Sequence, residues 1–333
     1  MPDTLPIVGT GDFRYRPVPD WPTLPAGWSF EEVVGMATDA RDEVYVFNRG
    51  EHPVIVFDAA GHFVRAWGEG QFQRPHGITI APDGAVFLTD DHDHSVRKFS
   101  PDGDLLMTLG ARGVPSDTGI QGLDYRTILR PAGPFNLPTN LAIAADGGLY
   151  VTDGYGNCRV HRFSAEGELQ FSWGEPGDGP GQFNLPHGIG IDPEGLVYVA
   201  DRENSRIQIF TPTGEFLREW TETARPMEVF FDSRGLAFVC DVGWKAGLFP
   251  WQSPPSQDPP GGYVRILDRE GELLSRWGGG TDPCAPGDFF APHDICVDSQ
   301  GAVYVAEVCR SAGGYRGLVS LDCHTIQKFV PMT

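Results

Sequence analysis

The feature that most constrains this chain is an internal repeat with a constant spacing. Six short apolar segments are each followed by a turn and a second apolar segment. The residues just before the six first segments are Val34, His76, Thr139, His187, Met227 and His293. Fourteen positions later, at the end of each second segment, stand Asn48, Asp90, Asp153, Asp201, Asp241 and Glu307. Unrelated hairpins would not place a side chain with a carbonyl group at the same 14-residue spacing six times. The chain therefore contains six copies of one unit.

Each unit predicts a four-stranded antiparallel meander. In the first unit, two further apolar segments follow at residues 54–57 and 63–68. The 43 Gly and 29 Pro are spread along the chain and punctuate these short segments, as in all-β proteins. Six such units predict a six-bladed β-propeller, a single domain over residues 1–333 with blades beginning near residues 34, 76, 139, 187, 227 and 293.

Three other segments are assigned from the repeat. Insertions at about residues 111–134 and 243–262 interrupt it, and insertions in repeat proteins usually lie on one face, often the binding face. The sixth unit lacks a fourth strand after residues 327–330. The N-terminal segment 12–18 has strand character, and we expect it to complete the last blade and remove an open edge.

The formal net charge of −20 makes nucleic acids and anionic membranes unexpected partners. The N-terminus has no apolar run typical of a signal peptide, and no stretch approaches 18 apolar residues, so the expected location is cytoplasmic.

None of the six cysteines form a CxxC pair. Cys240 and Cys296 are expected in the core; Cys309 and Cys323 could pair, but free thiols are expected without a secretory context.

Histidine occupies the position before the first strand only in units two, four and six, as His76, His187 and His293. Alternate blades of a six-fold ring are about 120° apart, so three imidazoles are expected to meet near the axis. Three histidines with an open fourth position are typical of catalytic zinc, although imidazole also suits other first-row metals. The alternative is a ring of histidines with a structural role.

Other polar residues are expected at the same end of the channel. Arg49 directly follows Asn48 of unit one, Arg202 directly follows Asp201 of unit four, and Tyr155 lies two residues after Asp153. Salt bridges for the arginines and simple packing for the tyrosine are the alternative interpretations. His92 and His94 are interpreted as loop residues. Asp294 directly follows His293, where a carboxylate and backbone carbonyls could bind a hard cation.

These residues resemble NHL repeats and, more narrowly, the peptidyl-α-hydroxyglycine α-amidating lyases. The resemblance covers nearly the whole chain. It is carried by three Pro-His phrases and by the segments 47–52, 153–155 and 200–208.

The resemblance implies residue roles. It implies zinc on His76, His187 and His293, Tyr155 as the catalytic base, Arg49 as its partner and Arg202 as a substrate-side arginine. It also implies a structural calcium on Asp294 and the carbonyls of Met36 and Ile78. The implied reaction breaks the C–N bond of an α-hydroxyglycine-like substrate, a small molecule or a peptide C-terminus, to an amide and a glyoxylate-type aldehyde.

The sequence departs from the pattern of this family at two positions. Gly156 follows Tyr155 where secreted members have a paired cysteine, and Ala291 replaces a family methionine two residues before His293. A smaller α-hydroxy-amide substrate is therefore an alternative to a peptide. The competing functions are a metal-dependent hydrolase, such as a lactonase, and a non-enzymatic binding scaffold. The sequence leaves the oligomeric state open.

Overall fold

The computed structural model describes residues 5–243 and 262–332. The described chain forms two compact units. The first comprises Met1–Ala66 and Asp232–Thr333, and the second comprises Trp67–Phe231. The single domain expected over residues 1–333 stays a prediction. The insertion expected at residues 243–262 lies, apart from its two end residues, outside the described part of the chain.

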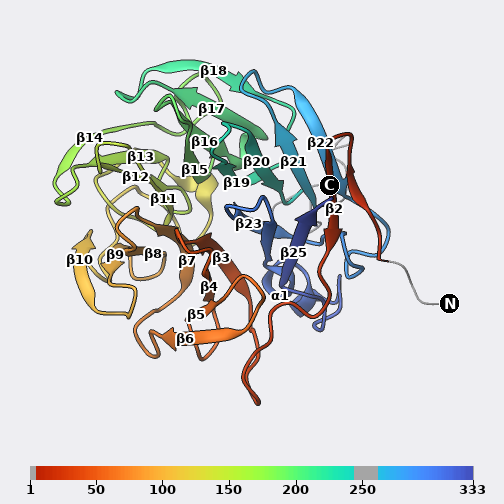
Figure 1. Cartoon of the computed structure of the whole chain (residues 1–333). Helices are drawn as coiled ribbons and strands as arrows, with labels where there is room; N and C mark the ends of the chain where they lie inside the picture. Colours follow the sequence, from red (N-terminus) through yellow and green to blue (C-terminus); the bar gives the residue numbers. More distant parts are fainter. Residues whose placement is uncertain (1–4, 244–261, 333) are drawn as a thin grey trace. The chain divides into compact units, whose positions relative to one another are not determined.

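The second unit contains three complete four-stranded antiparallel sheets (Figure 1). Their strands are β7 (Pro75–Ile80), β8 (Val86–Asp90), β9 (Ser95–Phe99) and β10 (Leu105–Leu109); β11 (Pro138–Ile143), β12 (Leu149–Asp153), β13 (Arg159–Phe163) and β14 (Leu169–Trp173); and β15 (Pro186–Ile191), β16 (Val197–Asp201), β17 (Arg206–Phe210) and β18 (Phe216–Trp220). Two 3₁₀ turns, η1 (Tyr125–Thr127) and η2 (Arg202–Asn204), lie between strands.

The remaining three sheets follow the same pattern. Their strands are β3 (Val33–Thr38), β4 (Val44–Asn48), β5 (Val54–Phe57) and β6 (Phe63–Trp67); β19 (Pro226–Phe231), β20 (Ala237–Asp241), β21 (Tyr263–Leu267) and β22 (Leu273–Gly278); and β1 (Val8–Thr10), β2 (Phe13–Pro17), β25 (Ile326–Pro331), β24 (Val303–Glu307) and β23 (Pro292–Val297). A short helix α1 (Cys309–Ala312) and the 3₁₀ turn η3 (Gly314–Arg316) connect β24 to β25. The prediction of an all-β, six-bladed propeller is confirmed.

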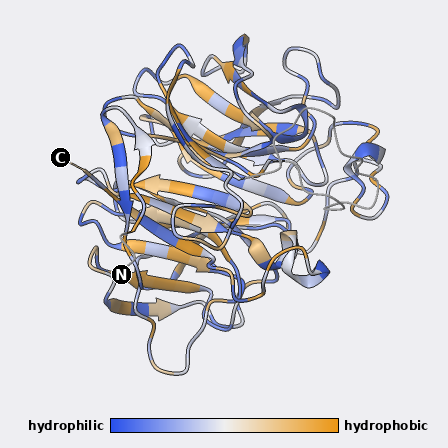
Figure 2. Ribbon diagram, turned by 90° about the vertical axis from the view of Figure 1, so that its right-hand side faces the viewer, coloured by the Kyte–Doolittle hydropathy of each residue, from blue (hydrophilic) through white to orange (hydrophobic). Residues whose placement is uncertain are grey.

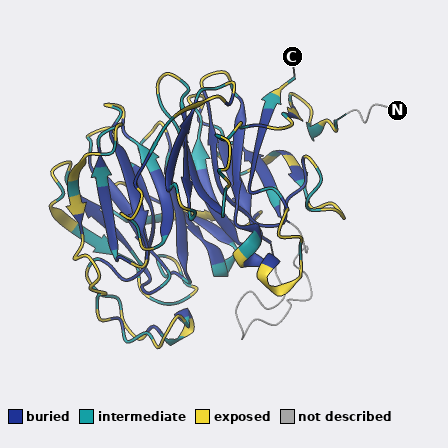
Figure 3. Cartoon of the chain, turned by 90° about the horizontal axis from the view of Figure 1, so that it is seen from below, coloured by how far each residue is buried: buried dark blue, intermediate teal, exposed yellow. Residues whose placement is uncertain are grey.

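The strands form because apolar β-branched and aromatic residues alternate with turn residues. Hydrophobic residues are concentrated on the strands (Figure 2). The second strand of each sheet is buried along its whole length, as in β4 and β16. The fourth strand is only partly buried, as in β6 and β18. Figure 3 shows the same contrast between buried inner strands and more exposed outer ones. Each sheet therefore buries its inner strands and leaves its outer edge to solvent.

The constant 14-residue spacing has a direct structural reason. The acid at the end of the second strand accepts hydrogen bonds from backbone N–H groups just ahead of the first strand. Asp90 accepts from Gln73 N at 2.8 Å and from Arg74 N at 2.9 Å. Equivalent hydrogen bonds recur in four other units. The accepting side chains, each with the residues whose backbone N–H groups donate, are Asn48 (Glu31 and Glu32), Asp153 (Asn136), Asp201 (Asn184) and Glu307 (Phe290 and Ala291). This side chain, an acid or Asn48, thus fixes how the chain enters the first strand, which carries the histidine in units two, four and six.

The N-terminal strand completes the last sheet, as expected. β2 pairs with β25 in antiparallel register, with Tyr15 opposite Pro331 (Figure 1). The short strand β1 adds a fifth strand that the sequence did not predict. Trp21, just past β2, packs its ring against Gly61, where an added Cβ would lie 2.6 Å from the indole. Trp67 makes the equivalent contact with Gly103, so the N-terminal segment also supplies an inter-blade tryptophan.

One expectation about the cysteines is wrong. Cys323 was expected to be a free thiol, with Cys309 as its possible partner, but Cys323 forms a disulfide with Cys284, with the two Cα atoms 5.0 Å apart. The two residues are 39 positions apart, and only the tertiary structure brings their loops together. Cys309 is a buried free thiol, and Cys240 and Cys296 are buried core residues, as expected.

Candidate functional site

The three predicted histidines are held in the same way. The Nδ1 atom of His76 lies 2.7 Å from the Thr139 carbonyl, that of His187 lies 2.8 Å from the Met227 carbonyl, and that of His293 lies 2.7 Å from the Val34 carbonyl. All three side chains are buried. The accepting carbonyls belong to the three repeat positions where histidine is absent. A bond to a carbonyl requires the proton on Nδ1, which leaves Nε2 as the metal-binding nitrogen.

Local backbone irregularity aims these side chains. The pairing of the first and second strands shifts register around each histidine, between Pro75 and Ile78 in β7, Pro186 and Ile189 in β15, and Pro292 and Asp294 in β23. Such bulges commonly re-aim a side chain next to a functional site. The Pro-His phrase of the sequence is therefore a bulge at the start of an inner strand.

In the second unit, Tyr155 joins two of the histidines. Its hydroxyl lies 3.2 Å from Nε2 of His76 and 3.2 Å from Nε2 of His187. The centres of the two imidazole rings are 4.8 Å apart. Gly154 makes this approach feasible, because a Cβ there would meet the Pro186 carbonyl oxygen at 1.8 Å. The structure therefore brings the Tyr155 hydroxyl to both histidines of the second unit.

The donor set fits a divalent first-row metal. A neutral imidazole whose Nδ1–H is held by a backbone carbonyl is the usual form of a histidine ligand, because the second contact fixes both the tautomer and the ring orientation. His76 and His187 in the second unit and His293 in the first unit share this arrangement, and each offers one Nε2 atom to a metal ion. The chemistry of three imidazoles does not by itself distinguish zinc from its neighbours.

Arg202 stands beside the phenol within a buried charge cluster. Its guanidinium carbon lies 5.5 Å from the centre of the Tyr155 ring. Glu203 accepts from Arg202 Nε at 2.8 Å, from Arg225 Nη2 at 2.5 Å and from the Tyr125 hydroxyl at 3.1 Å. Burial alone would raise the pKa of Glu203, but the two guanidiniums outweigh it and hold that pKa below its ordinary value. One buried carboxylate thus faces two guanidinium groups, and the guanidinium of Arg202 lies next to the phenol.

Arg74 is a site residue that the sequence reasoning missed. Its guanidinium carbon lies 5.7 Å from the centre of the Tyr155 ring, and Nη1 forms a 2.7 Å ion pair with the buried carboxylate of Asp91. Its side chain is 31% exposed, compared with 3% for Arg202. Arg74 directly precedes the first Pro-His phrase, and this position could have drawn attention to it.

The other predicted site residues lie in the first unit, apart from Ile78, which is buried in β7. Arg49 forms a 2.7 Å ion pair with Glu32. Both carboxylate oxygens of Asp294 accept backbone N–H groups, from Met36 and Ile295, each at 2.8 Å. Burial raises the pKa of Asp294 to about 7. The calcium roles of the Met36 and Ile78 carbonyls, and the partnership of Arg49 with Tyr155, stay predictions.

Comparison with known proteins identifies the family. The NHL repeat model matches residues 72–99, 135–163 and 183–210. NHL repeat-containing protein 3 from Homo sapiens is 31% identical over 340 residues, which cover 97% of this chain and 86% of that protein. The chain therefore belongs to the NHL-repeat family of β-propellers.

Relatives named for an amidating activity are about as similar to this chain as NHL repeat-containing protein 3 is. The peptidyl-alpha-hydroxyglycine alpha-amidating lyase 1 of Drosophila melanogaster is 30% identical over 75% of this chain and 46% of that protein. The peptidylglycine alpha-amidating monooxygenase of Rattus norvegicus is 31% identical over 90% of this chain. The chain spans only 31% of that monooxygenase. The resemblance to the peptidyl-α-hydroxyglycine α-amidating lyases, predicted from the sequence, is thereby confirmed.

Solved structures share the fold at low sequence identity. A gluconolactonase from Xanthomonas campestris is 14% identical, covers 98% of this chain and 95% of its own, and has a TM-score of 0.61. A virginiamycin B lyase from Staphylococcus aureus is 12% identical, covers 96% of this chain and 100% of its own, and has a TM-score of 0.59. Within residues 5–243 and 262–332, no helix has the length and apolar character needed to cross a membrane.

Proposed function

We propose that this protein is a metal-dependent lyase acting on acyl-α-hydroxyglycine-type substrates. The reaction breaks the bond between the amide nitrogen and the carbon that bears the hydroxyl, giving a primary amide and glyoxylate. The hydroxyl proton moves to the departing nitrogen, so the products contain all the atoms of the substrate. The substrate is a small molecule or a peptide C-terminus, and the net charge of −20 disfavours nucleic acid as a partner.

The observation that carries this proposal is the placement of Tyr155. Its hydroxyl lies 3.2 Å from the Nε2 atoms of both His76 and His187, whose Nδ1 atoms are occupied by backbone carbonyls. A lyase needs a group that removes a proton from a hydroxyl beside the metal and returns it to nitrogen. A phenol at this point suits that exchange, whereas hydrolases commonly use a carboxylate base.

The chain supplies the proton transfer and its electrostatic support. Tyr155 accepts the proton of the α-hydroxyl and donates it to the amide nitrogen as the C–N bond breaks. The cationic guanidinium carbons of Arg202 and Arg74 lie 5.5 and 5.7 Å from the centre of the Tyr155 ring. The same positive charge attracts the substrate carboxylate.

We propose that His76, His187 and His293 hold the metal, with zinc as the first candidate. A bound zinc ion would supply Lewis acidity to the substrate oxygen. The common tether of all three Nδ1 atoms supports this assignment, because it prepares three equivalent ligands. Calcium on Asp294 and the carbonyls of Met36 and Ile78, and Arg49 as partner of Tyr155, belong to the same proposal.

The test is glyoxylate release from α-hydroxyhippurate by the purified, zinc-loaded protein. Tyr155→Phe keeps the ring and removes only the hydroxyl, so we expect kcat to fall by about 100-fold or more while bound zinc is retained. His187→Ala removes a ligand and is expected to abolish both zinc binding and activity. His62→Ala, at a largely exposed position, is the matched control and is expected to behave like the parent.

The outcomes separate the competing functions. Full activity of Tyr155→Phe would refute the proposed base. Bound metal without glyoxylate release, but with lactone hydrolysis, would replace the lyase with a hydrolase. Absence of both bound metal and activity would leave a binding scaffold, which is a common role of NHL repeats.

A further inference from the structure

The second unit has an open cavity of about 330 Å³ beside the Tyr155 loop. Its lining includes Gln73, His92, His94, Leu123, Asn136 and Leu137. Gln73 lies three residues before His76 in sequence. This volume is at the lower end of the range for small-molecule sites.

The cavity and the phenol are built on the same backbone. The Leu137 carbonyl accepts from Tyr155 N at 3.4 Å, and the Asn136 carbonyl accepts from Gly156 N at 3.0 Å. Gly156 is required at this contact, because a Cβ there would lie 2.2 Å from Asn136 Oδ1. Two lining residues therefore also hold the loop that presents the phenol.

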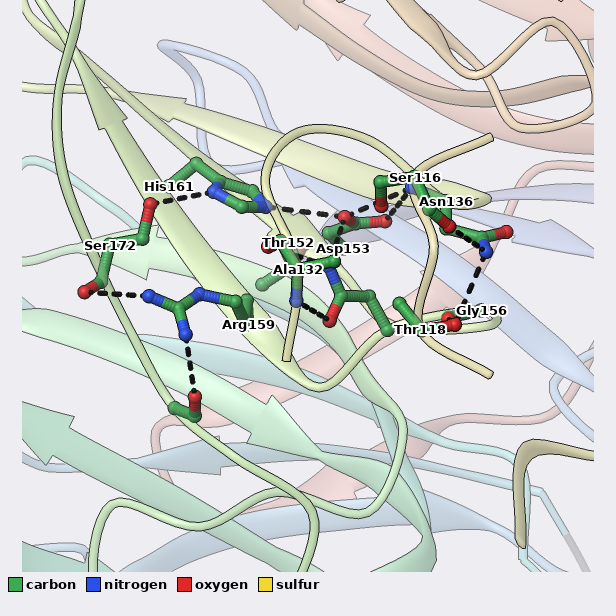
Figure 4. Close-up of polar contacts among 12 residues, drawn as sticks. Ser116, Thr118, Ala132, Asn136, Thr152, Asp153, Gly156, Arg159, His161 and Ser172 are labelled. Atoms are coloured by element: carbon green, nitrogen blue, oxygen red, sulfur yellow. Dashed lines mark hydrogen bonds and ion pairs between the residues drawn. The ribbon is translucent and has the colours of Figure 1, made fainter. Parts of the chain in front are cut away.

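The outer wall comes from the insertion at residues 111–134, whose Pro115, Ile120, Gly122 and Leu123 line the cavity. This wall is tied to the site at two points. Thr118 Oγ1 donates to the Gly156 carbonyl at 2.6 Å, and Asn136 Nδ2 donates to the Ser116 carbonyl at 2.9 Å (Figure 4). Further along the insertion, the Tyr125 hydroxyl donates to Glu203, the partner of Arg202. The insertion is thus anchored to residues on both sides of the phenol.

The lining suits an acyl group. Leucine, isoleucine and proline supply apolar surface, and the amide side chains of Gln73 and Asn136 supply a few polar atoms. His94 Nδ1 accepts from Leu137 N at 3.1 Å, which places the imidazole proton on Nε2 as a donor for a carbonyl. Predominantly apolar walls with a few placed polar groups are typical of sites for compact organic groups.

We propose that this cavity binds the acyl substituent on the amide side of the substrate, with a compact, largely apolar acyl group as its ligand. The inference rests on the proposed lyase reaction and specifies its substrate class. With the reacting carbon at Tyr155, the acyl group extends past the Tyr155–Gly156 backbone toward Asn136 and Leu137. The insertion therefore sets acyl selectivity, and Leu123 in its wall is a specificity-determining residue.

The experiment compares α-hydroxyhippurate, which carries a benzoyl group, with N-acetyl-α-hydroxyglycine. Leu123→Trp places a larger side chain at the cavity wall, and we expect the ratio of kcat/KM for benzoyl over acetyl to fall about 10-fold. Leu129→Trp is the matched control. Leu129 lies on the same insertion, is 73% exposed and packs on Gly119 instead of lining the cavity. The control is expected to keep the parent ratio.

Calorimetric binding of hippurate, which lacks the reactive hydroxyl, provides a readout that does not depend on turnover. We expect Leu123→Trp to weaken hippurate binding about 10-fold and Leu129→Trp to leave it unchanged. An unchanged benzoyl-to-acetyl ratio or unchanged hippurate binding in Leu123→Trp would overturn the acyl subsite, even with glyoxylate still released. Leu123-dependent hippurate binding without glyoxylate from either substrate would refute the lyase reaction and keep the cavity as an acyl-binding site.

Discussion

At the scale of single residues, the site depends on close backbone approaches as much as on the histidines themselves. His76 is held by the Thr139 carbonyl, and the glycine after it allows the strand that carries Thr139 to come close. A Cβ on Gly77 would meet Asn140 Oδ1 at 2.4 Å and Thr139 O at 2.7 Å. The glycine of the His-Gly pair is therefore part of what positions the imidazole.

Gly77→Ala is expected to lower the free energy of unfolding by about 1–3 kcal/mol, because the added methyl group overpacks a buried contact. Urea denaturation of the purified protein measures the change. Gly133→Ala is the control, since a Cβ there meets nothing within 4 Å. Equal stability of the two variants would show that Gly77 is not needed for this approach.

At the scale of elements, each blade is organised by the acid at the end of its second strand. Asp153 is fully buried and accepts from Asn136 N at 2.9 Å, Asn157 Nδ2 at 2.9 Å and His161 Nε2 at 3.2 Å (Figure 4). These bonds join β12 and β13 to the segment that leads into β11. One side chain therefore links three strands of a blade and sets the entry to the inner strand.

Asp153→Ala would leave several buried donors unsatisfied, and we expect it to cost about 3 kcal/mol or more. Thermal and urea denaturation measure the loss. Glu166→Ala, at an exposed position in the turn between β13 and β14, is expected to change stability by less than about 0.5 kcal/mol. A loss of that small size in Asp153→Ala would contradict the structural role of the repeat acid.

A second element-level link predicts pH dependence. His324, in the connection between α1 and β25, lies 2.8 Å from the buried carboxylate of Glu307 on β24. Burial pulls the pKa of His324 down, but the hydrogen bond and charge of Glu307 outweigh it and raise the pKa above its ordinary value. A raised folded-state pKa stabilises the fold below the unfolded-state value of about 6.5. That stabilisation is lost as pH rises through the folded-state pKa.

The stability difference between the parent and His324→Gln is therefore expected to be larger at about pH 6 than at about pH 9. Urea midpoints of both proteins at the two pH values measure it. Taking the difference between the proteins cancels the titration of groups common to both. A difference that is constant with pH would show that the His324–Glu307 pair does not titrate in this way.

At the scale of the whole molecule, the two ends of the chain belong to one sheet. β2 from the N-terminal segment pairs with β25 near the C-terminus, and Trp21 packs on Tyr304 with ring centres 4.9 Å apart. The Cys284–Cys323 disulfide joins the loop before β23 to the loop before β25 in the same sheet. Pairing and a covalent link therefore both hold the closing blade together.

Reduction of this disulfide is expected to destabilise the fold by about 3–4 kcal/mol, because a 39-residue separation is released in the unfolded chain. The test is thermal unfolding with and without dithiothreitol. The double variant Cys284→Ser with Cys323→Ser should start at the lower stability and be insensitive to dithiothreitol. Equal midpoints for oxidised and reduced parent would rule out a stabilising role.

The repeat register let the sequence alone predict the six blades, the closing N-terminal strand and the shared position of three histidines, because one local hydrogen-bond pattern recurs at a constant spacing. Tyr155 was also predicted, through its place after a repeat acid and through family resemblance. Only the tertiary structure decided the pairing of Cys284 with Cys323, the position of Arg74 beside the phenol, and the cavity walled by the insertion. These contacts join segments far apart along the chain, and no local spacing encodes which of them meet.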